Sequence, residues 1–127
     1  MENRLKAGKE LKEHREGLVK KQKGICGVSG IEMTAPVLDH CHESGLCRMA
    51  LQREINAFEG KVFNAWKRYV RHLGVPFDEV LAGLVKYHQS DFTDQPLHPT
   101  HRTDDEKRLL RNKRARRSRK KAKKRAK

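Results

Sequence analysis

Residues 37–48 read VLDHCHESGLCR, and this stretch organises the rest of the chain. An apolar pair leads into an acid and two imidazoles, Asp39, His40 and His42, at what we predict to be the end of a strand. A Glu-Ser-Gly turn follows, and residues 46–51 are expected to return as a second strand. The stretch therefore predicts a β-hairpin with polar groups gathered at one end.

The pleat of a strand restricts how these polar groups can point. Side chains alternate between the two faces, so His40 and His42 share a face and Asp39 points the other way. If Asp39 and His40 serve one site, the backbone must be irregular between them. Taken singly, His40 suits a surface histidine and Asp39 a turn acid.

A helix is predicted after the hairpin, because apolar residues recur at steps of three or four from Leu51 to Leu73. Asn56 lies at the edge of this apolar stripe, where it can face the hairpin. An asparagine inside a helix has poor propensity, which favours a specific role. The spacing of Asn56 behind Asp39 and His40 changes the interpretation from three isolated polar residues to one site.

The residue types at this site suit metal-assisted phosphodiester hydrolysis. The oxygens of Asp39 and Asn56 are hard donors of the kind that Mg²⁺ or Mn²⁺ prefers. A neutral His40 can take a proton from an attacking water, since its ordinary pKa lies near working pH. A protonated His42 can hold a phosphate oxygen.

These motifs resemble the phage recombination endonuclease VII family, a branch of the HNH (ββα-metal) nucleases. The pattern Leu-Asp-His-x-His-x2-Gly-x2-Arg begins at Leu38, and Asn56 and Gly60 follow in register. Residues 22–30 resemble the first zinc-knuckle segment of the family. The resemblance covers about residues 15–75.

The resemblance implies a role for each matching residue. Asp39 and Asn56 would be metal ligands, His40 the general base, and His42 an auxiliary contact to phosphate or metal. Arg48 would support the hairpin or bind a DNA phosphate. The implied substrate is DNA, including four-way junctions or other branches, and the family suggests a homodimer by analogy.

The family usually holds its hairpin with a structural Zn²⁺ on two Cys-x2-Cys pairs, and this chain departs from that pattern. The first pair reads Cys26-x2-Ser29, and the second falls on Gln52 and Ile55. With one thiol of four left, the four-cysteine site cannot form, and we expect no structural zinc. A rearranged site that joins Cys26 to the two hairpin cysteines stays open beside the simpler interpretation of three small apolar residues.

Charge divides the chain of 127 residues into a neutral body and a basic tail. Residues 107–127 contain 14 Lys or Arg and no acid, which equals the whole net charge of +14. We expect this tail to be disordered alone and helical on a polyanion, where it would act as a sequence-independent phosphate clamp or, more simply, as a solubilising segment. The tail residues assigned to DNA are Arg111, Lys113, Arg114, Arg116, Arg117, Arg119, Lys120 and Lys121.

The expected fold class is α+β and mostly helical: a small ββα-metal core flanked by helices. We expect a charged helix over 1–23, the nuclease domain with a packing helix over 24–89, a linker over 90–103, and the basic tail over 104–127.

The sequence also indicates a cellular location for the protein, and it leaves two alternative functions open. The start of the chain has no apolar signal region, no run is long enough to span a membrane, and three cysteines suggest a reducing compartment. We expect a phage protein that acts in the host cytoplasm. The alternatives are an HNH nicking or homing-type endonuclease on duplex DNA, and a non-catalytic basic protein that binds DNA or RNA on a decayed nuclease fold.

Overall fold

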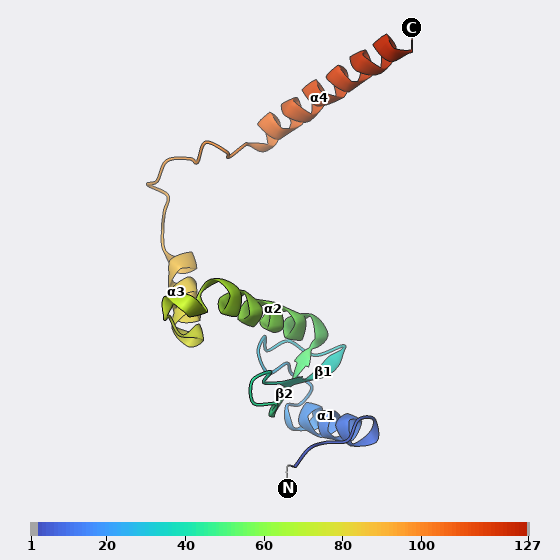
Figure 1. The fold of residues 1–127 in the computed structure, drawn as a ribbon, viewed down its shortest axis with the longest axis vertical. Coiled ribbons are helices and arrows are strands. Elements are labelled where there is room, and N and C mark those ends of the chain that lie inside the picture. The colour runs from blue at the N-terminus through green and yellow to red at the C-terminus, as the bar shows by residue number, and fades with distance from the viewer. Residues whose placement is uncertain (1–2, 127) are drawn as a thin grey trace. The chain divides into compact units, whose positions relative to one another are not determined.

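The computed structural model describes residues 3–126 and has the predicted mostly helical α+β fold. It divides into two units, residues 1–88 and residues 89–127, which are described separately. Within 3–126, no helix is long and apolar enough to cross a membrane. The elements in chain order are α1 (Lys9–Lys21), β1 (Pro36–His40), β2 (Cys47–Gln52), α2 (Arg53–Tyr69), the 3₁₀ turn η1 (Arg71–Leu73), α3 (Phe77–Gln89) and α4 (Asp104–Arg125) (Figure 1).

The predicted hairpin is present as the antiparallel pair β1–β2. Its first strand begins at Pro36, a position where the missing N–H interrupts no ladder bond. Leu38 pairs with Ala50, but His40 pairs with Cys47, so the register shifts between Leu38 and His40. The backbone is therefore irregular at Asp39, as a site using both Asp39 and His40 requires.

A loop before β1 forms the knuckle segment and packs on β2. The N–H of Cys26 donates to the carbonyl of Ile31 at 2.8 Å, and the N–H of Gly27 donates to the carbonyl of Ala50 at 3.2 Å. A Cβ on Gly27 would lie 2.8 Å from the Met49 sulfur, so a larger residue here would require the Met49 side chain to move. Cys26 and Ala50 are buried in the small core.

The hairpin lies between α1 and α2, each of which contacts both strands (Figure 1). The N-terminal helix is shorter than the predicted 1–23: α1 starts at Lys9, after Gly8, whose φ of 86° interrupts helical geometry. Side chains of opposite sign pair along it at a spacing of four residues, for example Lys9 with Glu13 at 3.8 Å.

An aromatic cluster joins α2 to α3. The ring of Phe77 lies 5.1 Å from that of Phe63 and 5.6 Å from that of Trp66, centroid to centroid. The indole N–H of Trp66 also donates to the carbonyl of Val75 at 2.9 Å. The 3₁₀ turn η1 that follows α2 ends at Gly74, which has the left-handed conformation with φ 76°.

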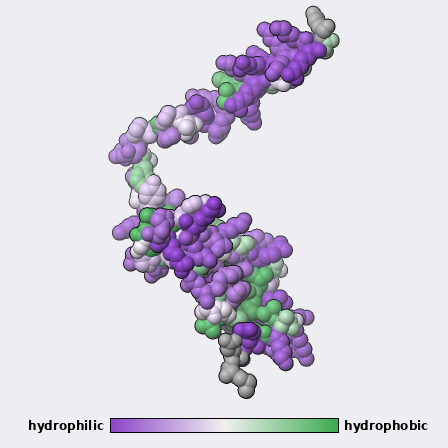
Figure 2. All heavy atoms as spheres, viewed as in Figure 1, coloured by the Kyte–Doolittle hydropathy of each residue, from purple (hydrophilic) through white to green (hydrophobic). Residues whose placement is uncertain are grey.

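The basic tail forms α4, a helix of 22 residues with none buried. A capping box formed by Thr103 and Glu106 starts it, and the acids of its first turn stabilise the helix by lying at the positive end of the helix dipole. Hydrophilic residues cover almost all of this helix (Figure 2). The structure therefore differs from the expectation of a tail that is disordered alone, because a strong cap precedes a run of good helix formers.

Candidate active site

Asp39 lies at the end of β1 and is buried, with 6% of its surface exposed. Its carboxylate accepts two hydrogen bonds from Arg48 on β2: Nε to Oδ2 at 2.6 Å and Nη2 to Oδ1 at 3.1 Å. A bidentate pair of this kind is among the stronger charged contacts in proteins. Arg48 therefore has a structural partner within the hairpin.

Arg48 also reaches α2, where its Nη2 lies 3.2 Å from the Glu59 carboxylate. The hydrogen bond to Asp39 raises the pKa of Arg48 against partial desolvation, and Glu59 adds to the rise. Two carboxylates from different elements thus converge on one cation. Sequence reasoning missed Glu59, although its position three residues after Asn56 on the same helix was a usable signal.

Asn56 lies in the first turns of α2 and is half-buried. Within residues 3–126, no group of three or more His, Cys, Asp or Glu side chains gathers to hold a metal. The available hard donors are the carboxylates of Asp39 and Glu59 and the amide oxygen of Asn56, with water and phosphate to complete the shell. This donor chemistry fits Mg²⁺, and the carboxylates already hold one cation, the Arg48 guanidinium.

The two histidines form a second set at the same end of the hairpin. The rings of His40 and His42 lie 4.6 Å apart, centroid to centroid, and both side chains are exposed. The structure brings His40 to His42 and Asp39 to Arg48. Among the described residues, it places no hydrogen bond or ion pair between the two sets.

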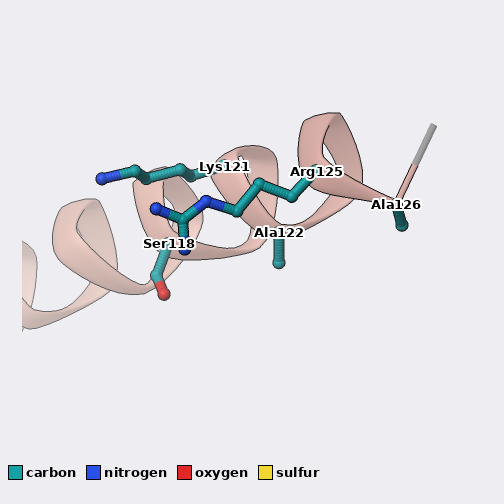
Figure 3. Close-up of a pocket in the computed structure, with 5 residues that line it drawn as sticks. All are labelled: Ser118, Lys121, Ala122, Arg125 and Ala126. Carbon is teal, nitrogen blue, oxygen red and sulfur yellow. The ribbon is translucent and has the colours of Figure 1, made fainter.

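The predicted phosphate-binding residues of the tail are exposed and lie on α4. Figure 3 shows Lys121 and Arg125 extending along this helix beside the small side chains of Ser118 and Ala122. The hollow that they line is open helix surface, which suits contact with an extended polyanion better than enclosure of a small ligand.

The residues at the four zinc positions do not fit a structural Zn²⁺. The fold brings the knuckle to the second pair, because the backbone N–H of Gln52 donates to the Cys26 sulfur at 3.3 Å. The other positions, however, hold a hydroxyl at Ser29 and an apolar side chain at Ile55. Nor do the three cysteines form a rearranged site within residues 3–126, where no such cluster exists.

Hydrogen bonds of two glutamine side chains hold this part of the fold together. The Gln22 side chain accepts the N–H of Ala50 at 2.9 Å and donates to the carbonyl of the same residue at 2.8 Å, so it ties the knuckle segment to β2. The side-chain oxygen of Gln52 accepts the N–H groups of Thr34 at 2.9 Å and Ala35 at 3.1 Å, so it ties the residues just before β1 to the end of β2.

Cys26 carries an unusual thiol at this junction. Burial alone would raise the pKa of Cys26, but hydrogen bonds from the side chain and backbone of Ser29, with backbone bonds from Gln52 and Val28, lower it to about 7. Ser29 therefore stabilises a thiolate at the position where a metal would otherwise do so.

The sequence of the chain is similar to that of a known protein family. A sequence model of the recombination endonuclease VII family matches residues 2–112, which is most of the chain. The family is one of nucleases, for which DNA is the implied substrate class and a metal ion the implied cofactor. On this evidence, the chain belongs to the recombination endonuclease VII family.

Proposed function

We propose that the chain is a metal-dependent endonuclease that hydrolyses phosphodiester bonds in branched or junction DNA. The observation that supports the proposal is the register shift between Leu38 and His40, which makes the backbone irregular at Asp39. Asp39 reaches α2 through Arg48 and Glu59, while His40 stays exposed to a substrate. Because the irregular backbone at Asp39 breaks the strict alternation of faces along the strand, both side chains can serve one phosphodiester.

In this proposal His40 is the general base. Its exposed imidazole takes a proton from the attacking water, and His42, whose ring lies 4.6 Å away, holds a phosphate oxygen when protonated. Asp39 and Asn56 would hold a divalent metal, which when bound supplies positive charge against the charge that develops on phosphate. Arg48 then keeps Glu59 as its partner.

Helix α4 is the proposed phosphate clamp. It carries 13 Lys or Arg residues over 22 positions and spans about 33 Å. Helices of such charge bind the DNA backbone without reading sequence, and their affinity falls as salt rises. The clamp would raise affinity for any DNA and leave the choice of structure to the body.

A homodimer belongs to the same proposal. Large apolar side chains stay exposed on α2 and η1, including Phe58 at 66%, Tyr69 at 62% and Leu73 at 66%. Apolar surface of this extent on a small body suits contact with a second copy.

Two other functions remain candidates. The bidentate bond between Arg48 and Asp39 favours a non-catalytic nucleic-acid-binding protein, because a carboxylate held by guanidinium is less available to a metal. A nicking or homing-type enzyme on duplex DNA would use the same side chains on a different substrate.

The test compares cleavage of labelled four-way junction, nicked and linear DNA, with Mg²⁺ or with EDTA. We expect magnesium-dependent cleavage of the junction, reduced about 10²- to 10⁴-fold in His40→Ala and lost in Asn56→Ala. His98→Ala, in the linker, is the matched control and should cleave like wild type. Cleavage at the wild-type rate by His40→Ala would contradict the mechanism, and binding without cleavage would favour the non-catalytic protein.

A further inference from the structure

A groove runs between α1 and the hairpin and opens onto His40. It encloses about 930 Å³ and is lined by Leu11 and His14 from α1, Leu38 and His40 from β1, and Leu46 after the hairpin turn. The volume falls within the range of pockets that hold small organic ligands. Neither Leu11 nor His14 has a role in the proposed mechanism.

The lining of the groove combines hydrocarbon with polar groups, among which the guanidinium of Arg4 carries a positive charge. Leu11, Leu38 and Leu46 supply hydrocarbon surface, and the imidazoles of His14 and His40 supply hydrogen-bonding groups. Among the residues that the structure describes, none that lines the groove is acidic. This combination suits a ligand with a flat apolar face and an anionic end, which is the chemistry of a nucleotide.

The state of the DNA decides whether a nucleotide can enter. In a paired duplex the phosphates lie outside and the faces of the bases are stacked on one another, so no base face is free to contact the leucine side chains. An unpaired base at a branch or bulge has a free face and costs less to unstack than a paired base. Because His40 lines both the groove and the proposed site, a base in the groove would belong to a nucleotide next to the scissile phosphate.

We propose that this groove binds the unstacked base of the nucleotide beside the scissile phosphate, with the base between Leu11 and Leu46 and with His14 bonded to its polar edge. The inference rests on the proposed function and deepens it, because the groove then supplies the preference for branched DNA. Leu11 and His14 are specificity residues under this proposal, and they take no part in proton transfer.

The test uses DNA that carries 2-aminopurine at a single-nucleotide bulge, bound by the full chain in EDTA so that no cleavage occurs. We expect wild type to change the fluorescence of the bulged base and to bind bulged DNA better than a matched duplex. In the Leu11→Ala/Leu46→Ala double variant, binding to bulged DNA should weaken roughly tenfold and the fluorescence change should be lost. Leu97→Ala in the linker is the matched control.

Two further measurements keep the outcomes distinct. His14→Ala alters an exposed residue, so it tests the groove without removing apolar packing, and it should lower the preference for bulged over paired DNA. An unchanged fluorescence response in both groove variants, or no response in wild type, would overturn the inference. Absence of magnesium-dependent cleavage by wild type, with the fluorescence response intact, would instead overturn the proposed nuclease function and leave the groove as a binding site.

Discussion

Replacing Gln52 with alanine tests whether side-chain hydrogen bonds stabilise the hairpin at a position where the family usually has a zinc ligand. Gln52 is buried, with 8% of its surface exposed, and its side-chain oxygen accepts the N–H groups of Thr34 and Ala35. It lies at the N-cap of α2 but makes no side-chain capping bond, so the substitution removes no cap. The variant removes the side-chain bonds from the end of β2 to residues 34–35 before β1, and with them the bonds that the Gln52 amide donates to the Thr34 hydroxyl and the Glu54 carboxylate.

The expected loss follows from the two backbone groups left without a partner. Each unsatisfied buried donor costs about 1–3 kcal/mol, but Thr34 is exposed and Ala35 only half-buried, so water replaces part of both bonds and Gln52→Ala should reduce the free energy of unfolding by about 1–2 kcal/mol. A small domain has only about 5–15 kcal/mol in total. With an m-value of about 1–3 kcal/mol/M in urea, the midpoint should fall by roughly 0.5–1 M.

The assay is urea unfolding followed by the fluorescence of Trp66, the one tryptophan of the chain, in buffer without divalent metal. Gln95→Ala is the matched control, because the Gln95 side chain also makes a hydrogen bond but lies exposed in the linker. A zinc-selective chelator should leave the wild-type midpoint unchanged. A loss below about 0.5 kcal/mol in Gln52→Ala, or a lower wild-type midpoint with chelator, would refute the reasoning.

Two further predictions concern the Cys26 thiol and α4. The pKa of Cys26 is about 7 in the folded protein, below its ordinary value of 9.0, so the thiolate contributes stability that is fully present above pH 9 and is lost as pH falls through 7. In a variant whose only cysteine is Cys26, thiolate absorbance should titrate near pH 7. Adding Ser29→Ala to that variant should raise the pKa of Cys26. A midpoint near 9 in the variant that keeps Ser29 would contradict the assignment. Removing residues 104–127 should flatten the salt dependence of DNA binding: if about six charges of α4 meet phosphates, the full chain has a log–log slope of roughly −5 and the shortened chain a slope nearer zero. Equal slopes for the two chains would show that α4 does not contact DNA.

Local pattern was sufficient for the elements of this fold. The turn between two short apolar runs predicted the hairpin, and the three-four spacing after it predicted α2. The ends of the helices likewise depend on neighbouring residues, since Gly74 ends η1 and Thr103 caps α4. The family could be predicted for a similar reason, because the residues of its motif lie close together in the chain, from Leu38 to Gly60.

The sequence alone therefore determined the hairpin, the helices, the basic tail and the family, all of which depend on residues close together in the chain. Only the tertiary structure decided that Arg48 holds Asp39 and Glu59, that Gln22 ties the knuckle segment to Ala50 of β2, and that Leu11 faces the hairpin across a groove. Each of these contacts joins different elements, and its partners depend on packing geometry and on the need to satisfy buried polar groups. The periodicity of residues within one element does not predict which residue of another element it will contact.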